Sequence, residues 1–530
     1  DYNIKDVELV DALEDHLGMI QLMFTMAYEA KINYNDVYSQ NRMWDVIIYN
    51  YLLEKDVIIP QRRHHTKGAK YVGAYVKEPQ VGQHEWIMSF DLNSLYPHLI
   101  MQYNISLETL IKQQFPDSIS IDRLLNKEVN TDVLGDKLTV TPNGACFRTD
   151  IRGFLPELME KYYTDRTKFK GYLLEAKQNY EDTKDRKYLS QISTYHNIQM
   201  ARKIALNSAY GALGNEYFRY YDERMATAIT TSGQLSIRWI ESRVNKYLND
   251  ILKTDNIDYI VASDTDSIYV RFKELVDKVN PKNPIEFLNK VAEEKLQPFI
   301  NGCYQELADY VHAYDQKMEM GREVIADKGI WTAKKRYILN VHDNEGVRYS
   351  EPNLKVMGIE SVKSSTPYAC RQKMKDSLKV IVNEDESSVN KFIQDFRKDF
   401  MNLPVEETAF PRSVNGLRKW GDKSSIFKKG TPMHIKGALI YNHLLKKHKL
   451  THKYQLIQEG EKLKYLLLKT PNILQSNVIA FISELPKEFN LHEQIDRDKQ
   501  FSKSFVDPIE MIMECIDWQV DRSYGTRRTL

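Results

Sequence analysis

Two short clusters of acidic residues have the types and spacing that phosphate chemistry requires. The first starts at Asp91 and continues Leu-Asn-Ser-Leu-Tyr-Pro, and the second contains Asp264 and Asp266. Each follows an apolar run, where a β-strand would place a carboxylate at a sheet edge. Two Mg²⁺ ions about 3.5–4 Å apart need carboxylates on such a rigid support. Asp also tolerates turn geometry, so either cluster alone is equally typical of a plain hairpin turn.

Two predicted helices, 157–180 and 188–213, lie between the clusters and are joined by a polar turn. Side chains suited to phosphate recur at i, i+4 and i+7, and therefore share one face of each helix. They are Arg166 and Lys170 on the first helix and Lys203, Asn207 and Tyr210 on the second. If the helices pair antiparallel, these groups converge on one concave face. That face suits a triphosphate, and the alternative is an ordinary solvated helix surface.

Length and composition exclude several classes of protein. A chain of 530 residues should form several domains with an ample core. It has no run of eighteen apolar residues and no signal peptide, so we expect no membrane span and no membrane partner. The four cysteines form no CxxC pair, which argues against structural zinc or an iron–sulfur cluster. They are Cys146, Cys303, Cys370 and Cys515.

Charge is unevenly distributed although the net charge is only +1. Residues 411–470 contain fourteen Lys or Arg, opposed by Asp422, Glu459 and Glu461. A basic stretch of this kind is commonly just a solvated face. Beside a phosphate-chemistry site, a surface that binds a nucleic-acid backbone becomes the better interpretation.

Periodicity predicts the remaining elements. We expect helices within 7–56 and 216–250, a loop at 61–70, strand-like structure at 71–104, a hairpin at 257–272 and strands around 330–360, with a mainly helical remainder.

Several motifs in this sequence, taken in their order along the chain, match those of one protein family. The chain resembles the family B DNA polymerases, and in particular their T-even bacteriophage branch, over nearly its whole length. The matching runs are Asp91–Pro97 (motif A), Lys203–Gly211 (motif B), Asp264–Ser267 (motif C), Lys334–Tyr337 (K-x-Y), and the branch-like segments 73–79 and 357–367.

The resemblance implies an α+β, right-hand polymerase with an antiparallel-sheet palm, two-helix fingers and a mainly helical thumb. Five segments follow from it. They are 1–62 (the end of an exonuclease domain and part of an N-terminal domain), 63–152 (palm), 153–215 (fingers), 216–365 (palm) and 366–530 (thumb).

The resemblance also implies roles for individual residues. Asp91, Asp266 and the Leu92 carbonyl would hold two Mg²⁺ ions, with Asp264 in support and Lys203 as the acid for pyrophosphate. The dNTP-binding residues would be Ser94, Leu95, Tyr96, Arg166, Lys170, Lys203, Asn207, Tyr210 and Gly211. Primer–template DNA would be contacted by Lys335, Tyr337 and Lys363. Glu323 is a weaker candidate for a palm carboxylate.

The chain departs from the family pattern at several places. Ser263 stands where motif C has Gly, and the finger helices are predicted to be short, at roughly 25 residues each. Asp6 resembles a ligand of the family's 3′–5′ exonuclease, but the companion carboxylates are not in the sequence, so we expect no self-contained proofreading. No sliding-clamp peptide is visible at the C-terminus. Because the chain begins at Asp1, we expect a fragment, a processed product or an engineered piece.

The prediction from sequence is therefore template-directed, primer-dependent DNA synthesis in an infected bacterial cell. One rival is a subunit that is inactive until a separate exonuclease-bearing polypeptide joins it. Another is a catalytically silent DNA-binding scaffold, which the presence of Asp91, Asp264 and Asp266 disfavours. Tyr96 disfavours an RNA-synthesising enzyme, because a ring beneath the sugar leaves no room for a 2′-hydroxyl.

Overall fold

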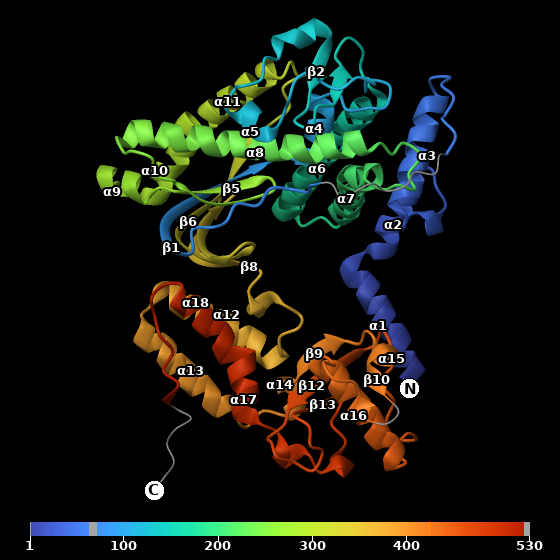
Figure 1. Cartoon of the computed structure of the whole chain (residues 1–530), viewed down its shortest axis with the longest axis vertical. Coiled ribbons are helices and arrows are strands. Elements are labelled where there is room, and N and C mark those ends of the chain that lie inside the picture. Colours follow the sequence, from blue (N-terminus) through green and yellow to red (C-terminus); the bar gives the residue numbers. More distant parts are fainter. Residues whose placement is uncertain (1, 63–71, 423–424, 524–530) are drawn as a thin grey trace. The chain divides into compact units, whose positions relative to one another are not determined.

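The computed structural model describes residues 2–62, 72–422 and 425–523 (Figure 1). The chain divides into two compact units. The first consists of Asp1–Lys77, Ser89–Val270 and Pro281–Glu323, and the second of Glu78–Met88, Arg271–Asn280 and Val324–Leu530. Most of the predicted loop at 61–70, and the final residues 524–530 where a clamp peptide was sought, lie outside the described residues.

The main sheet has six strands in the order β4-β5-β1-β6-β7-β8. Their bounds are β1 (Gly82–Leu92), β4 (Ile260–Asp264), β5 (Ser267–Arg271), β6 (Met320–Ala333), β7 (Arg336–Asn344) and β8 (Val347–Met357). The pairs β4–β5, β6–β7 and β7–β8 are antiparallel. Strands β1 and β6 each contribute residues to both units. Helices and an antiparallel sheet together confirm the predicted α+β class.

The first unit is mainly helical. Its helices are α1 (Tyr2–Leu17), α2 (Met19–Ala30), η1 (Tyr34–Asp36), α3 (Gln40–Leu53), α4 (Leu95–Gln102), α5 (Ile121–Leu125), η2 (Asp132–Lys137), α6 (Phe154–Thr183), α7 (Lys187–Leu213), α8 (Glu223–Leu252), α10 (Pro284–Val291), η3 (Ala292–Leu296) and α11 (Gln297–Tyr310). A small hairpin joins β2 (Leu138–Val140) and β3 (Cys146–Arg148).

Helix α8 is the long helix seen across the first unit in Figure 1. The Asp222 side chain caps it by accepting a hydrogen bond from Arg224 N, and Lys253 ends it in the left-handed conformation. Its inward face is buried along most of its length and packs on α4, α11 and β4. This packing supports the strands that carry the acidic clusters.

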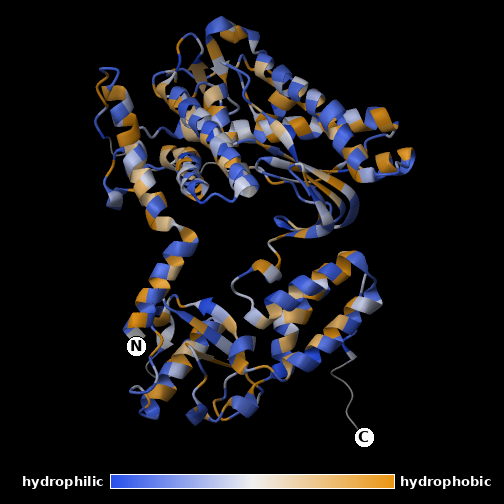
Figure 2. Ribbon diagram, turned by 180° about the vertical axis from the view of Figure 1, so that it is seen from behind, coloured by the Kyte–Doolittle hydropathy of each residue, from blue (hydrophilic) through white to orange (hydrophobic). Residues whose placement is uncertain are grey.

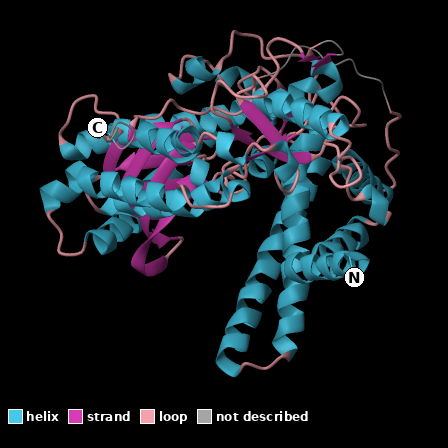
Figure 3. Cartoon of the chain, turned by 90° about the horizontal axis from the view of Figure 1, so that it is seen from below, coloured by secondary structure: helices cyan, strands magenta, loops and turns pink. Residues whose placement is uncertain are grey.

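The helices α6 and α7 form the antiparallel pair that the sequence predicts, joined by a short loop (Figure 3). They are 30 and 27 residues long, somewhat longer than predicted. The α7 face with Ala201, Ala205 and Ser208 is buried, whereas Lys203 and Asn207 are exposed. Lys203 and Asn207 therefore lie on the solvent-facing side of α7, apart from the side that packs into the core.

One predicted element is wrong. Strand-like structure was expected throughout 71–104, but β1 ends at Leu92 and α4 begins at Leu95. Ser94 takes a left-handed conformation (φ 45°, ψ 55°) that breaks the strand and starts the helix. Helix α4 is buried at nearly every position. Its sequence therefore lacks the alternation of apolar and polar residues by which a helix is distinguished from a strand.

The second unit contains the strands β7 to β13 in full, together with parts of β1, β5 and β6. Its helices are α9 (Lys273–Val279), η4 (Glu360–Val362), α12 (Tyr368–Asn383), α13 (Glu386–Phe400), α14 (Val405–Thr408), α15 (Leu417–Trp420), α16 (Met433–Lys447), η5 (Lys487–Phe489), η6 (His492–Gln494), α17 (Arg497–Phe501), η7 (Ser502–Val506) and α18 (Asp507–Glu514). Its short strands are β9 (Phe410–Ser413), β10 (Gly421–Asp422), β11 (Ile426–Phe427), β12 (Lys462–Leu467) and β13 (Val478–Phe481).

Two apolar cores stabilise the described part of residues 366–523, where helices alternate with the short strands β9 to β13. One lies between α16 and the three-stranded sheet β13-β12-β9, which the sequence analysis did not predict. The other gathers α12, α13 and α18 around phenylalanines. Burying such large aromatic side chains is among the most stabilising contributions to a domain core.

The N-terminal helices α1 and α2 expose many large apolar side chains. Ile4, Val7 and Val10 are each more than 60% exposed. Figure 2 shows hydrophobic and hydrophilic residues interleaved along this end of the chain. Exposed apolar groups in such density are typical of a surface that another protein segment covers. Within the described residues, no helix combines the length and apolar character needed to cross a membrane.

Candidate active site

Strand β1 delivers the first acidic cluster to the end of the sheet. Its residues Ile87–Phe90 are buried, and Asp91 is half-buried at the strand end. The Leu92 N–H donates to the Asp266 carbonyl at 2.8 Å, and the Asn93 N–H donates to the Glu319 carbonyl at 3.0 Å. Main-chain hydrogen bonds on both sides therefore fix the backbone next to Asp91.

The second cluster forms the tip of the β4–β5 hairpin. Asp264 pairs with Ser267 across the hairpin, and Thr265 has a positive φ of 58°. The Asp266 N–H donates to the Asp264 carbonyl at 2.6 Å. Because Asp266 also accepts from Leu92, the structure brings the two predicted metal-binding carboxylates, Asp91 and Asp266, onto adjoining backbones.

These groups suit Mg²⁺, which prefers oxygen ligands. Asp91 and Asp266 supply carboxylates, and the predicted third ligand is the Leu92 main-chain oxygen. The described residues contain no cluster of three or more His, Cys, Asp or Glu side chains placed to hold a metal ion. A set of two carboxylates and one carbonyl does not require such a cluster, so the Mg²⁺ site remains a prediction.

The turn after Asp91 collects residues from three helices. The Arg166 Nη1 donates to Ser94 Oγ at 3.3 Å, which brings α6 to this turn. The Tyr96 ring lies 4.6 Å from the Tyr210 ring between centroids, at 51°. A Cβ added at Gly233 of α8 would lie 3.5 Å from the Tyr96 ring, so α8 packs closely behind Tyr96.

His98 supports this turn from within the core. Its Nδ1 donates to the Ser94 carbonyl at 3.0 Å, and its ring meets the Tyr163 ring edge-on at 4.5 Å. Burial lowers the pKa of His98, while the Ser94 carbonyl opposes that effect. The hydrogen bond from His98 stabilises the left-handed conformation of Ser94 from within the core.

The other predicted nucleotide-binding residues lie on α6, α7 and α4. Lys170, Lys203 and Asn207 are exposed, and Gly211 follows on α7. Lys203 and Asn207 lie one turn apart on one face, as predicted. Leu95 is buried at the start of α4.

Glu323 lies on β6, the strand next to β1. The Ser89 Oγ on β1 donates to Glu323 Oε2 on β6 at 3.1 Å. Glu323 therefore lies beside Ser89, which is two residues before Asp91 on β1, and its role as a metal-site carboxylate remains a prediction.

The predicted DNA-contacting residues belong to the second unit. Lys335 occupies the β6–β7 turn with φ 59°, and Tyr337 is buried beside Trp331, with ring centroids 5.7 Å apart. A Cβ at Gly358 would come within 2.1 Å of the Lys335 carbonyl, so only glycine fits there. The Lys363 Nζ donates to Glu360 Oε1 at 2.9 Å.

Comparison with known proteins decides the family. The model of DNA polymerase family B matches residues 37–516. The chain belongs to DNA polymerase family B. It is 35% identical to the DNA-directed DNA polymerase of Enterobacteria phage T4, over 97% of this chain and 63% of that protein. It is also 35% identical to the DNA-directed DNA polymerase of Escherichia phage RB69, over 96% of this chain and 62% of that protein.

A solved structure supports the same fold. The family B DNA polymerase of the hyperthermophilic archaeon Pyrobaculum calidifontis matches with a TM-score of 0.57 and 18% identity. That match covers 95% of this chain and 54% of the archaeal chain. The present chain thus spans a little under two thirds of the length of its phage relatives.

Sequence reasoning missed the residues that hold the motif B helix of this family B member. The Trp44 Nε1 donates to the Ala205 carbonyl at 3.2 Å and to Ser208 Oγ at 3.1 Å. A Cβ at Gly211 would lie 2.7 Å from Gln40 Oε1, so the α3 helix presses on the end of motif B. No local pattern links residues about 160 positions apart, so the sequence carried no signal for these contacts.

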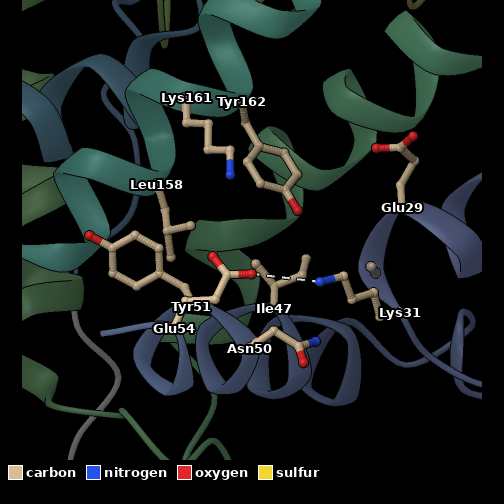
Figure 4. A pocket seen from close by; sticks show the side chains of 10 residues that line it. Glu29, Lys31, Ile47, Asn50, Tyr51, Glu54, Leu158, Lys161 and Tyr162 are labelled. Carbon is tan, nitrogen blue, oxygen red and sulfur yellow. Dashed lines mark ion pairs between the residues drawn. The ribbon is translucent and has the colours of Figure 1, made fainter. Parts of the chain in front are cut away.

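A small pocket of about 80 Å³ lies between α2, α3 and α6 (Figure 4). It is lined by Glu29, Lys31, Tyr51, Glu54 and Lys161 among others, and Lys31 pairs with Glu54 at 3.7 Å. None of the predicted site residues lines it, so it belongs to the packing of α2 and α3 on α6.

Proposed function

We propose that this family B chain performs template-directed, primer-dependent DNA synthesis from dNTPs. The observation that carries the proposal is the 2.8 Å hydrogen bond from Leu92 N to the Asp266 carbonyl. It sets the strand ends of Asp91 and Asp266 against each other, as a shared metal site requires. The phage relatives, described as DNA-directed DNA polymerases, support the same activity.

Asp91, Asp266 and the Leu92 carbonyl would hold two Mg²⁺ ions, with Asp264 beside them. When bound, such ions lower the pKa of the primer 3′-hydroxyl and neutralise charge on the triphosphate. The carboxylates must stay within a few tenths of an ångström of their working positions. Their main-chain hydrogen bonds provide that rigidity.

The finger helices would bind the triphosphate. Arg166, Lys203 and Asn207 offer cations and an amide toward phosphate oxygens, and Lys170 extends the same row by one turn. Lys203 would also give a proton to the leaving pyrophosphate, as a general acid. The N–H groups of Ser94 and Leu95, at the start of α4, would donate to phosphate oxygens.

Tyr96 would exclude ribonucleotides. Its ring is held between Tyr210 and α8, so it has little freedom to move away from a 2′-hydroxyl. Tyr210 and Gly211 would pack against the nascent base pair, where the shape of a correct pair is tested.

The duplex would be bound by the second unit. Lys335 and Tyr337 would contact the primer end and the minor-groove edge, and Lys363 would contact the backbone. Lys363 must leave Glu360 to do so, since the two are paired in this structure. The basic segment 411–470 would add phosphate contacts.

Primer extension by this chain with Mg²⁺ and four dNTPs tests the proposal. Asp266→Ala should abolish extension while duplex binding is retained. Asp250→Ala, which removes an exposed carboxylate from the end of α8, is the matched control and should extend normally. Extension by Asp266→Ala at the unmodified rate would refute the assignment.

A second candidate is a polymerase that becomes active only when a separate exonuclease-bearing polypeptide joins it in the infected cell. The exposed apolar side chains of α1, including Ile4, Val7 and Val10, favour it. Asp6, the candidate exonuclease ligand, is exposed on the same helix, so proofreading is not proposed for these residues alone.

Extension that appears only after the second polypeptide is added would support this candidate, and extension by the chain alone would refute it. Duplex binding without extension in either case would indicate a silent scaffold.

A further inference from the structure

A buried carboxylate lies directly beneath the catalytic hairpin. Glu241, on the inward face of α8, is only 9% exposed. Its Oε1 accepts a hydrogen bond from the hydroxyl of Ser263, which is 2% exposed and precedes Asp264 in β4. No ion pair found in the described part of the chain includes Glu241. Burying a carboxylate without an ion-pair partner is costly, so its retention calls for a reason.

The position of Ser263 gives that reason. The family motif has glycine there, which needs no partner, whereas a buried hydroxyl needs an acceptor. Glu241 is the acceptor that the fold supplies. Burial raises the pKa of Glu241, and the Ser263 hydroxyl opposes that rise. The charges that face it, Lys77, Arg238 and Asp258, act on it at longer range.

The outer edge of β4, which does not pair with β5, is held by a strap formed by residues 75–77. The Lys77 N–H donates to the Ser263 carbonyl at 3.1 Å, and the Thr265 N–H donates to the Tyr75 carbonyl at 2.9 Å. The Lys77 Nζ donates to Asp258 Oδ2 at 2.7 Å and to the Ile260 carbonyl at 2.8 Å. The strap binds only main chain and the base of the hairpin, so it leaves the side-chain face of Ser263 to Glu241.

We propose that Glu241 is a positioning residue, which fixes Asp264 and Asp266 through its hydrogen bond to Ser263. Consecutive Cα atoms are 3.8 Å apart, so a displacement of Ser263 passes directly to Asp264. The Asp266 N–H bonds to the Asp264 carbonyl, and the displacement therefore continues to Asp266. An error near 1 Å in a reacting group costs about 10²-fold in rate. This inference rests on the proposed role of those two carboxylates.

The test compares Glu241→Ala, Glu241→Gln, Ser263→Ala and the double variant Ser263→Ala/Glu241→Ala in primer extension. Glu241→Ala and Ser263→Ala should each lower kcat about tenfold, with KM for dNTP changed less than about twofold. Glu241→Gln should recover most of kcat, because its amide oxygen also accepts from Ser263. The double variant should be no slower than either single variant, because both remove the same bond. Ser377→Ala, which removes a buried hydroxyl bonded to its own helix, is the matched control.

A second readout does not depend on activity. Amide hydrogen exchange across Ile260–Ser267 should be faster in Glu241→Ala and unchanged in Glu241→Gln. If Glu241→Ala does not fold, the other two single variants test the proposal. Slow extension by Ser263→Ala together with normal extension by Glu241→Gln supports it. Unmodified kcat in Ser263→Ala overturns it, and so does a Glu241→Gln variant as slow as Glu241→Ala. If Asp266→Ala itself extends primers, the proposed function fails instead.

Discussion

The strand ends at Asp91 and Asp266 and the helix α7 of the first unit are held in place by different kinds of interaction. Asp91 and Asp266 sit on backbones joined by main-chain hydrogen bonds, such as Leu92 N to the Asp266 carbonyl. Helix α7 is held largely by side chains, including the Trp44 indole and the ion pairs of Arg202 with Glu29 and Asp165. Main-chain bonds survive most substitutions, whereas side-chain contacts depend on single residues. The rigid region fits the proposed metal ligands, and the other fits a proposed nucleotide-binding surface that adjusts on binding.

The largest expected effect comes from the rigid region. Asp91→Ala should lower the rate of primer extension by about 10³-fold or more, because it removes several kcal/mol of charge stabilisation at the reacting centre. Its melting temperature should stay close to that of the unmodified chain, since the backbone bonds remain. Single-turnover extension and thermal unfolding measure the two quantities. A slow variant that is also strongly destabilised would show that Asp91 has a structural role in this region.

Lys203 tests the adjustable region. Lys203→Ala should lower kcat about 10²-fold through loss of the general acid. Lys177→Ala, an exposed lysine on α6, should extend at the normal rate. Rapid-quench measurement of single-nucleotide addition compares them. Equal rates for the two variants would show that Lys203 does not act as the general acid.

Tyr96 lies where the two regions meet, and its effect should be smaller. Tyr96→Ala should raise incorporation of ribonucleotides relative to deoxyribonucleotides by about tenfold to 100-fold, since one steric contact is worth about 1–3 kcal/mol. Tyr96→Phe keeps the ring and should discriminate normally. The ratio of kcat/KM for dNTP and rNTP is the measurement, and relaxed selection in Tyr96→Phe would contradict a steric gate.

The smallest effect concerns pH and the side-chain contacts of α3. Burial alone would raise the pKa of Asp45, but the guanidinium groups of Arg219 and Arg62 outweigh it and hold that pKa below its ordinary value of 3.8. The carboxylate therefore stabilises the fold above pH 3.8, and this contribution is lost as the pH falls through the lowered pKa. Asp45→Asn should be less stable by about 1–3 kcal/mol at pH 7 and nearly equal to the unmodified chain near pH 2. Urea unfolding at both pH values measures it, and a difference independent of pH would contradict this account.

The sequence predicted the elements that carry local signals. The paired acidic clusters, the spacing of Lys203, Asn207 and Tyr210, and the hairpin around Asp264 were all readable from periodicity and motif order. Residues 95–102 were not, because a helix buried all round lacks the alternation that identifies it.

Contacts between residues far apart in the sequence could not be predicted, for a different reason. Trp44 and Ser208 lie 164 positions apart, and Glu241 and Ser263 come from a helix and a strand with no shared pattern. Ser263 was the one local signal, because it stands where the family motif has glycine. Only the fold shows that the Ser263 hydroxyl donates to Glu241. Three-dimensional packing, rather than propensity, selects such pairs.

The buried indole of Trp44 has a spectroscopic consequence. Within the described residues of the first unit, tryptophan occurs at Trp44 and Trp239, and Trp44 bonds directly to the helix proposed to grip the nucleotide. Any rotation of α7 on dNTP binding must change the hydrogen bonds and polarity around that ring. The chain therefore carries a built-in fluorophore, whose emission should report such a rotation of α7 without labelling.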